Sequence, residues 1–161
     1  MNLPQPRQPG YTLEDWKGWE GRWELIHGVP YAMTPAPSPE HQRVSFRLQK
    51  AIDGGLEETK RTGGGSCEVL SAPLDLFLPG EQSVYQPDLV VVCDPAKITF
   101  RGVEGIPDMV VEILSPSTAS KDMARKRWSY EAAGIPEYLI IDPEEKYGLL
   151  LRLAKGRYEE A

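Results

Sequence analysis

The chain has 161 residues and a net formal charge of −6. This length is typical of one domain with an ordinary hydrophobic core, so we expect a single domain over residues 1–161. No stretch has the roughly 20 apolar residues of a transmembrane helix. The acidic balance argues against a general nucleic-acid-binding surface, which is normally basic.

The N-terminal segment MNLPQPRQPG is polar and rich in proline. It lacks the hydrophobic region of a signal peptide, so we expect a flexible tail over residues 1–10 and a cytoplasmic protein. Cys67 and Cys93 stand apart without the spacing of metal ligands, and in a cytoplasmic protein we expect them to be buried thiols.

A short helix and a β-hairpin are predicted next. Thr12 is suited to cap a helix that ends near Gly18. Residues 22–26 (RWELI) and 29–33 (VPYAM) have the composition of strands, and His27-Gly28 between them is typical of a tight turn. The sequence therefore predicts an N-terminal β-hairpin.

A longer helix follows the proline-rich segment TPAPSPEHQ. Ser38 is expected to be its N-cap and Pro39 its first residue, a combination typical of helix starts. We expect this helix to break near Gly54-Gly55, because glycine has a low helix propensity.

The rest of the chain combines strands with one further helix. That helix is expected to begin at SPST, residues 115–118, and to end at Gly134. We place the strands at residues 67–72, 74–78, 84–93, 109–114, 137–143 and, as a strand or hairpin, 147–160. This order predicts a mixed sheet flanked by helices from both halves of the chain, an α/β or α+β fold.

Two carboxylates accompany the apolar strands. Asp88 precedes the run LVVV, and Glu112 lies inside the run MVVEIL. If these strands are neighbours, the two side chains lie together, and two close carboxylates repel unless they share a proton or a cation. Mg²⁺ would relieve that repulsion, because it binds one or two carboxylates together with water and phosphate oxygens.

Lys126 lies on the helix face that we expect to pack on the sheet. Spacings of four and three residues join a single face of this helix, made of Ala119, Met123, Lys126, Tyr130 and Ala133. The lysine could therefore extend its ammonium group to the two carboxylates, or to a phosphate bound beside them.

Pro87-Asp88 followed by Glu112 resembles the PD-(D/E)XK nuclease superfamily, except that Leu114 stands where its lysine is expected. More narrowly, the chain resembles the bacterial Uma-type family of restriction endonucleases. The matching stretches occur in the family's order over residues 20 to 145 and are WELIHG, SPEHQRV, QPDLVVV, PDMVVEILSPST, residues 122–126 and AGIPEYLIIDP.

This resemblance implies a restriction-endonuclease-like core and Mg²⁺-dependent hydrolysis of DNA phosphodiester bonds, with Mn²⁺ as a substitute. It implies that Asp88, Glu112 and the backbone carbonyl of Ile113 bind the metal. It also implies that Lys126 replaces the strand lysine and that Glu24 is a further acidic site residue. A homodimer is expected by analogy alone.

Two further residues are candidates without a defined role. Asp108 matches another acidic position of the family. His41, close to a helix start, is more typical of a surface or capping residue than of a general base.

Each assignment has a structural alternative. Glu112 could form an ion pair with the covering helix, Asp88 could be a turn residue after Pro87, and Lys126 could be a counter-ion alone. The chain would then be a non-catalytic interaction or regulatory module that retains the fold. Hydrolysis of a smaller phosphate ester is a third interpretation.

The aromatic residues include four tryptophans. We expect them to be core or interface anchors and not platforms on which bases stack, since large aromatic side chains dominate the energetics of cores and interfaces. They are Trp16, Trp19, Trp23 and Trp128.

Overall fold

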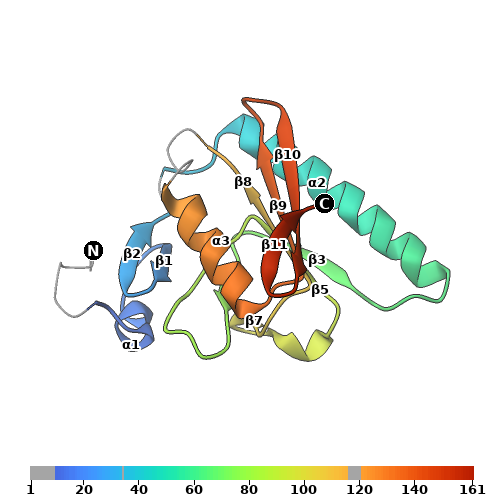
Figure 1. Ribbon diagram of the computed structural model, residues 1–161. Helices are drawn as coiled ribbons and strands as arrows, with labels where there is room; N and C mark the ends of the chain where they lie inside the picture. Colours follow the sequence, from blue (N-terminus) through green and yellow to red (C-terminus); the bar gives the residue numbers. More distant parts are fainter. Residues whose placement is uncertain (1–9, 34, 116–120) are drawn as a thin grey trace.

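The computed structural model describes residues 10–33, 35–115 and 121–161 of the chain, with side chains from residue 123 onward in the last range. Its elements, in chain order, are α1 (Leu13–Lys17), β1 (Trp23–Ile26), β2 (Val29–Ala32), α2 (Pro39–Arg61), β3 (Glu68–Ser71), β4 (Leu76–Phe77), β5 (Leu89–Val92), η1 (Pro95–Lys97), β6 (Ile98–Thr99), β7 (Gly102–Glu104), β8 (Met109–Ile113), α3 (Lys121–Ala133), β9 (Glu137–Asp142), β10 (Tyr147–Ala154) and β11 (Arg157–Glu160) (Figure 1).

A six-stranded mixed sheet forms the centre of the fold, with the strand order β11-β10-β9-β8-β5-β3. Only the β8–β9 pair within it is parallel, and α3 provides the crossover connection that such a pair requires. The remaining pairs of this sheet are antiparallel. The predicted mixed sheet with helices from both halves of the chain is confirmed.

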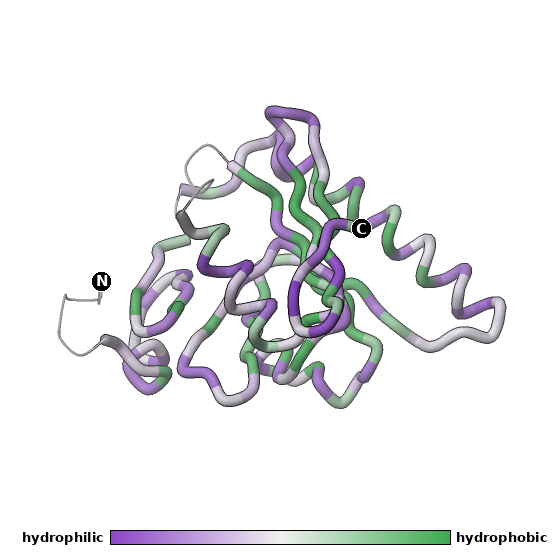
Figure 2. Tube along the Cα trace, viewed as in Figure 1, coloured by the Kyte–Doolittle hydropathy of each residue, from purple (hydrophilic) through white to green (hydrophobic). Residues whose placement is uncertain are grey.

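The two long helices cover opposite faces of this sheet. Leu48, Ile52 and Leu56 of α2 pack against Leu89 and Val111. On the other face, Tyr130 of α3 packs in the larger core cluster that includes Val90, Val110 and Tyr138. Successive residues of β5 and β8 alternate between the clusters, as the period of two in a strand requires. Figure 2 shows hydrophobic residues along these central strands.

The local signals at the helix ends and the first turn are confirmed. Thr12 forms a capping box with Asp15 at the start of α1. The Ser38 side chain accepts from the His41 amide at the start of α2, with Pro39 as the first helical residue. His27 and Gly28 both have positive φ, at 49° and 79°, as the tight turn between β1 and β2 requires.

Several elements differ in extent from the prediction, and one hairpin was not predicted. The predicted strand 74–78 is regular only over Leu76–Phe77. α2 continues through Gly54-Gly55 to Arg61 without a break, because glycine in a helix interior costs only about 1 kcal/mol relative to alanine. The predicted strand 84–93 is regular only over Leu89–Val92, since Pro87 has no amide hydrogen for a ladder. The β6–β7 hairpin was not predicted, and its strands have only two and three residues.

Some expectations concern residues outside the described ranges. These are most of the SPST helix start, Ala119 on the predicted helix face, and residues 1–9 of the expected tail. Among the helices that are described, none combines the length and apolar composition needed to cross a bilayer.

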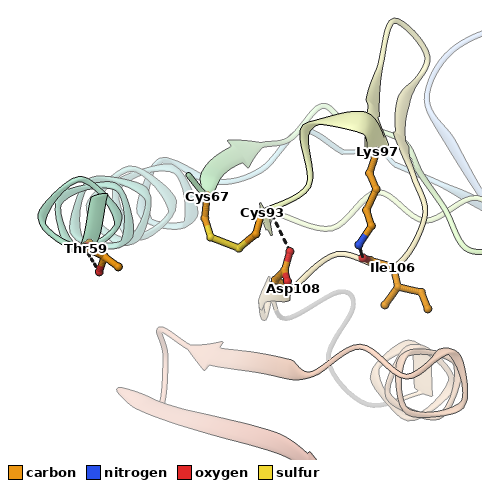
Figure 3. The surroundings of a disulfide bond; sticks show 7 residues. Thr59, Cys67, Cys93, Lys97, Ile106 and Asp108 are labelled. Carbon is orange, nitrogen blue, oxygen red and sulfur yellow. Dashed lines mark hydrogen bonds between the residues drawn. A yellow bond between two sulfur atoms is a disulfide. The ribbon is translucent and has the colours of Figure 1, made fainter. Parts of the chain in front are cut away.

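The expectation of two free thiols is wrong, because Cys67 and Cys93 form a disulfide (Figure 3). β3 and β5 pair with Glu68 opposite Val92, so the two cysteines are the next pair along the ladder. This pairing of strands was not predicted, and spacing in the sequence alone does not reveal it. Both side chains border the core cluster beneath α2.

Candidate functional site

Asp88 and Glu112 lie together at one end of the central sheet. β5 and β8 are antiparallel with Leu89 opposite Val111, so the register places Asp88 opposite Glu112. The amide of Ile113 donates a 2.7 Å hydrogen bond to Asp88 Oδ2. The predicted juxtaposition of these two residues is therefore confirmed.

Lys126 faces this pair from α3 and is only 6% exposed. Its Nζ donates to Glu112 Oε1 at 3.0 Å and to Glu24 Oε1 at 2.7 Å. Met123, Tyr130 and Ala133 also face the core cluster, so the predicted helix face is confirmed over the described residues. The lysine is thus a buried ammonium between two buried carboxylates.

Glu24 reaches the site from the N-terminal hairpin. Leu25 in β1 forms an antiparallel bridge with Val84, which joins the hairpin to the segment that leads into β5. Glu24 Oε1 also accepts a 2.7 Å hydrogen bond from the backbone amide of Gln86. One oxygen of Glu24 therefore receives both the Gln86 amide and the Lys126 ammonium.

Tyr130 completes the surroundings of Glu112, a role that the sequence analysis did not assign to it. Its hydroxyl donates to Glu112 Oε1 at 2.9 Å, from one helical turn beyond Lys126. Burial raises the pKa of Glu112 to about 7, against the opposing effect of the Lys126 charge and with a further rise from Asp88 and Glu24. Burial lowers the pKa of Lys126, but Glu112 and Glu24 together raise it by more, so the lysine stays charged.

His41 lies at the start of α2 and contacts Asp88. Its Nε2 is 3.2 Å from Asp88 Oδ1. The contact with Asp88 raises the pKa of His41, although burial opposes the rise. His41 Nδ1 is buried and has no hydrogen-bond partner in the part of the chain that the structure describes. His41 therefore contacts the site through its Nε2 and Asp88.

Asp108 is separated from this cluster along β8. Its Oδ2 accepts a 2.7 Å hydrogen bond from the amide of Cys93, beside the disulfide (Figure 3). Four residues of strand separate Asp108 from Glu112, a distance of roughly 13 Å at the rise of a β-strand. Asp108 thus connects β8 to the end of β5 at the opposite end from Asp88.

The structure brings Glu24, His41, Asp88, Glu112 and Lys126 together. Within the described residues, no group of three or more His, Cys, Asp or Glu side chains is arranged to hold a metal ion. A cation bound here would therefore depend on fewer side chains together with backbone and solvent or phosphate oxygens.

The arrangement of the mixed sheet and its flanking helices is that of a restriction-endonuclease-like fold. A crystal structure from Anabaena variabilis ATCC 29413, titled as a "putative nuclease belonging to DUF820", superposes with a TM-score of 0.72 at 19% identity. The superposition covers 93% of this chain and 83% of the other. At this identity, the similarity shows that the two chains share a fold.

The chain belongs to the Uma2 family, whose model is described as "Putative restriction endonuclease" and matches residues 11–161. Two proteins of Synechocystis sp. PCC 6803, both named "Uncharacterized protein", are similar in sequence. One is 32% identical over 143 residues, which are 86% of this chain and 72% of the relative. The other is 28% identical over 124 residues, 74% of this chain and 65% of the relative. Family and fold together support a nuclease-type function.

Proposed function

We propose that this chain is a Mg²⁺-dependent endonuclease that hydrolyses phosphodiester bonds of DNA. The observation that carries the proposal is the contact of the buried Lys126 ammonium with Glu112. Glu112 lies in β8, and the register of β8 with β5 places it opposite Asp88. An adjacent acidic pair and a lysine are the residue types of the nuclease superfamily, here with the lysine on a helix. In this proposal residues 1–161 form one nuclease domain.

Asp88, Glu112 and the Ile113 carbonyl are the proposed metal ligands. Their oxygen atoms fit Mg²⁺, which prefers oxygen donors and retains several waters. His41 supports the fit, because its Nε2 lies 3.2 Å from Asp88 Oδ1 and this contact raises its pKa. A group that carries positive charge when protonated thus already lies against one of the three proposed ligands. When bound, the metal supplies Lewis acidity and a more acidic water.

Lys126 is the proposed catalytic cation. Its ammonium orients the attacking water and stabilises charge that develops on the phosphate. Glu24 also accepts from that ammonium, while Tyr130 donates to the carboxylate of Glu112. Hydrolysis then needs no covalent intermediate on the enzyme.

A second candidate is a non-catalytic interaction module of the same fold. The observation that favours it is the pairing of Lys126 with both Glu24 and Glu112, which stabilises the fold without a metal. We favour the nuclease because Asp88 and His41 add a second contact between a carboxylate and a basic group beside this triad. A purely structural ion pair does not require them.

Calorimetric titration of Mg²⁺ and Mn²⁺ into wild type and Glu112→Gln tests the proposal, with plasmid nicking followed on the same samples. We expect wild type to bind metal and nick DNA, and the folded variant to do neither. If wild type binds no metal and Glu112→Gln changes only stability, the interaction module is correct. Sedimentation of the same samples tests the proposed homodimer, and fractionation of cells tests the proposed cytoplasmic location.

A further inference from the structure

A pocket of about 440 Å³ lies beside the candidate site, between α1, the start of β1 and the β6–β7 hairpin. Its aromatic lining includes Trp16, Trp19, Trp23 and Phe100. The tryptophans are half-buried, whereas Phe100, at the tip of the hairpin, is 100% exposed. The expectation that these tryptophans serve only as anchors therefore omits a surface that they share.

The tryptophan rings are fixed in place. Trp16 Nε1 donates to the Trp23 carbonyl at 2.8 Å, and Trp23 Nε1 donates to the Glu20 carbonyl at 2.9 Å. Trp19 stands edge-on to Trp23, with 5.9 Å between the ring centroids. Because both indole N–H groups are already bonded, Trp16 and Trp23 offer ring surface to a ligand and no hydrogen-bond donor.

Cations surround these rings although the chain is acidic overall. Lys17, Arg22 and Arg101 all line the pocket. Lys17 pairs with Glu14 and Arg101 with Glu104, but all four side chains are well exposed, and such pairs contribute little free energy. Both cations can therefore exchange their partners for phosphate oxygens.

The polar floor of the pocket is connected to the candidate catalytic lysine. The Gln86 side chain accepts from Arg22 and donates to Asp75 at 2.8 Å, while its backbone amide donates to Glu24. Glu24 in turn accepts from Lys126. Two hydrogen bonds thus separate the floor of the pocket from the ammonium proposed to act on the phosphate.

We propose that this pocket binds an unstacked base of the DNA strand that is being cut. Aromatic faces with interleaved cations are typical of sites for single-stranded nucleic acid, where bases stack and cations follow the backbone. This inference depends on the proposed function for one point, the identity of the occupant as DNA. It assigns base binding to Phe100 and the tryptophans, apart from the metal ligands.

The test is a tryptophan-fluorescence titration with single-stranded oligothymidylate in EDTA, so that no metal-dependent step contributes. An abasic oligonucleotide of equal length separates base stacking from phosphate attraction. Phe100→Ala is the variant, because a fully exposed side chain is not needed for folding. Phe46→Ala is its matched control, since Phe46 is 67% exposed on α2, outside the pocket lining.

We expect Phe100→Ala to bind oligothymidylate at least about fivefold more weakly than wild type, the lower end of the loss from removing one stacked base. Phe46→Ala should bind like wild type, and the abasic strand should bind weakly to all three proteins. Equal binding by Phe100→Ala and wild type, or of the abasic strand and oligothymidylate, would overturn the pocket assignment. The pocket assignment would also be overturned if sedimentation showed that Phe100→Ala weakens binding only by dissociating a dimer.

The two proposals fail separately. If wild type nicks plasmid and Phe100→Ala binds oligothymidylate as tightly as wild type, the nuclease proposal stands and the base pocket is rejected. If binding of oligothymidylate depends on Phe100 but wild type neither binds metal nor nicks DNA, the base pocket stands and the nuclease proposal is rejected.

Discussion

Lys126 of α3 donates a 3.0 Å hydrogen bond to Glu112 of β8, and both side chains are almost completely buried. Burying either charge alone would cost several kcal/mol. Their contact, together with Glu24, explains how a glutamate is accommodated in an apolar strand. It also makes the stability of the fold dependent on the residues proposed to act on DNA.

Lys126→Met is expected to destabilise the protein by about 3–5 kcal/mol at neutral pH, because it leaves two buried carboxylates without their cation. Urea denaturation measures the loss, and plasmid nicking should disappear in the fraction that stays folded. Arg152→Met is the matched control, since Arg152 pairs with Glu137 at the surface and its loss should cost less than about 1 kcal/mol. Similar losses in the two variants would contradict a buried charge cluster.

The Glu24→Gln variant should show whether Glu24 orients Lys126 or binds the metal. Glu24 contacts Lys126 and the Gln86 amide, so we expect metal affinity near that of wild type while nicking slows about 10–100-fold. Calorimetry and a nicking time course measure the two effects. Loss of metal binding would instead make Glu24 a ligand. Glu81→Gln serves as control, because Glu81 accepts from Tyr85 outside the site.

Metal-free protein should become less stable as the pH rises. The pKa of Glu112 is raised from 4.5 to about 7 by burial, so the folded state holds its proton more tightly than the unfolded state. The associated stability is complete below the unfolded pKa and is lost as pH rises through about 7. Thermal unfolding between about pH 5 and pH 8 should show a larger decrease for wild type than for Glu112→Gln. Equal decreases would show that another group is responsible.

Reduction of the disulfide should weaken the fold without removing the site. Cys67 and Cys93 are 26 residues apart in sequence, and a loop of this size typically gains about 2–4 kcal/mol from its crosslink. We expect denaturation midpoints to fall in dithiothreitol while metal binding persists, because Asp88 lies at the other end of β5. The Cys67→Ser/Cys93→Ser double variant should be insensitive to the reductant. Loss of metal binding on reduction would contradict this separation.

Much of the site could be predicted because strand and helix periods are regular. Alternation along two apolar runs placed Asp88 and Glu112 on one face, and the helical period turned Lys126 toward them. Those inferences need only local geometry and the assumption that the strands are neighbours. The register of β5 and β8 satisfies that assumption.

The parts that could not be predicted depend on contacts between distant segments. The approach of His41 to Asp88 requires the position of α2 relative to β5, and the disulfide requires the pairing of β3 with β5. The predicted break at Gly54-Gly55 is wrong because packing along α2 outweighs the low helix propensity of glycine. The β6–β7 hairpin has strands too short to leave a periodic pattern.

Lys126, the lysine proposed to be catalytic, lies on a helix, while Leu114, directly after β8, packs against the core. The proposed chemistry requires a nitrogen at one point in space, and either a strand or a helix can supply it. A search that demands a lysine two residues after the acidic strand residue would miss chains built in this way. A search that accepts an inward-facing lysine on the next helix would recover them.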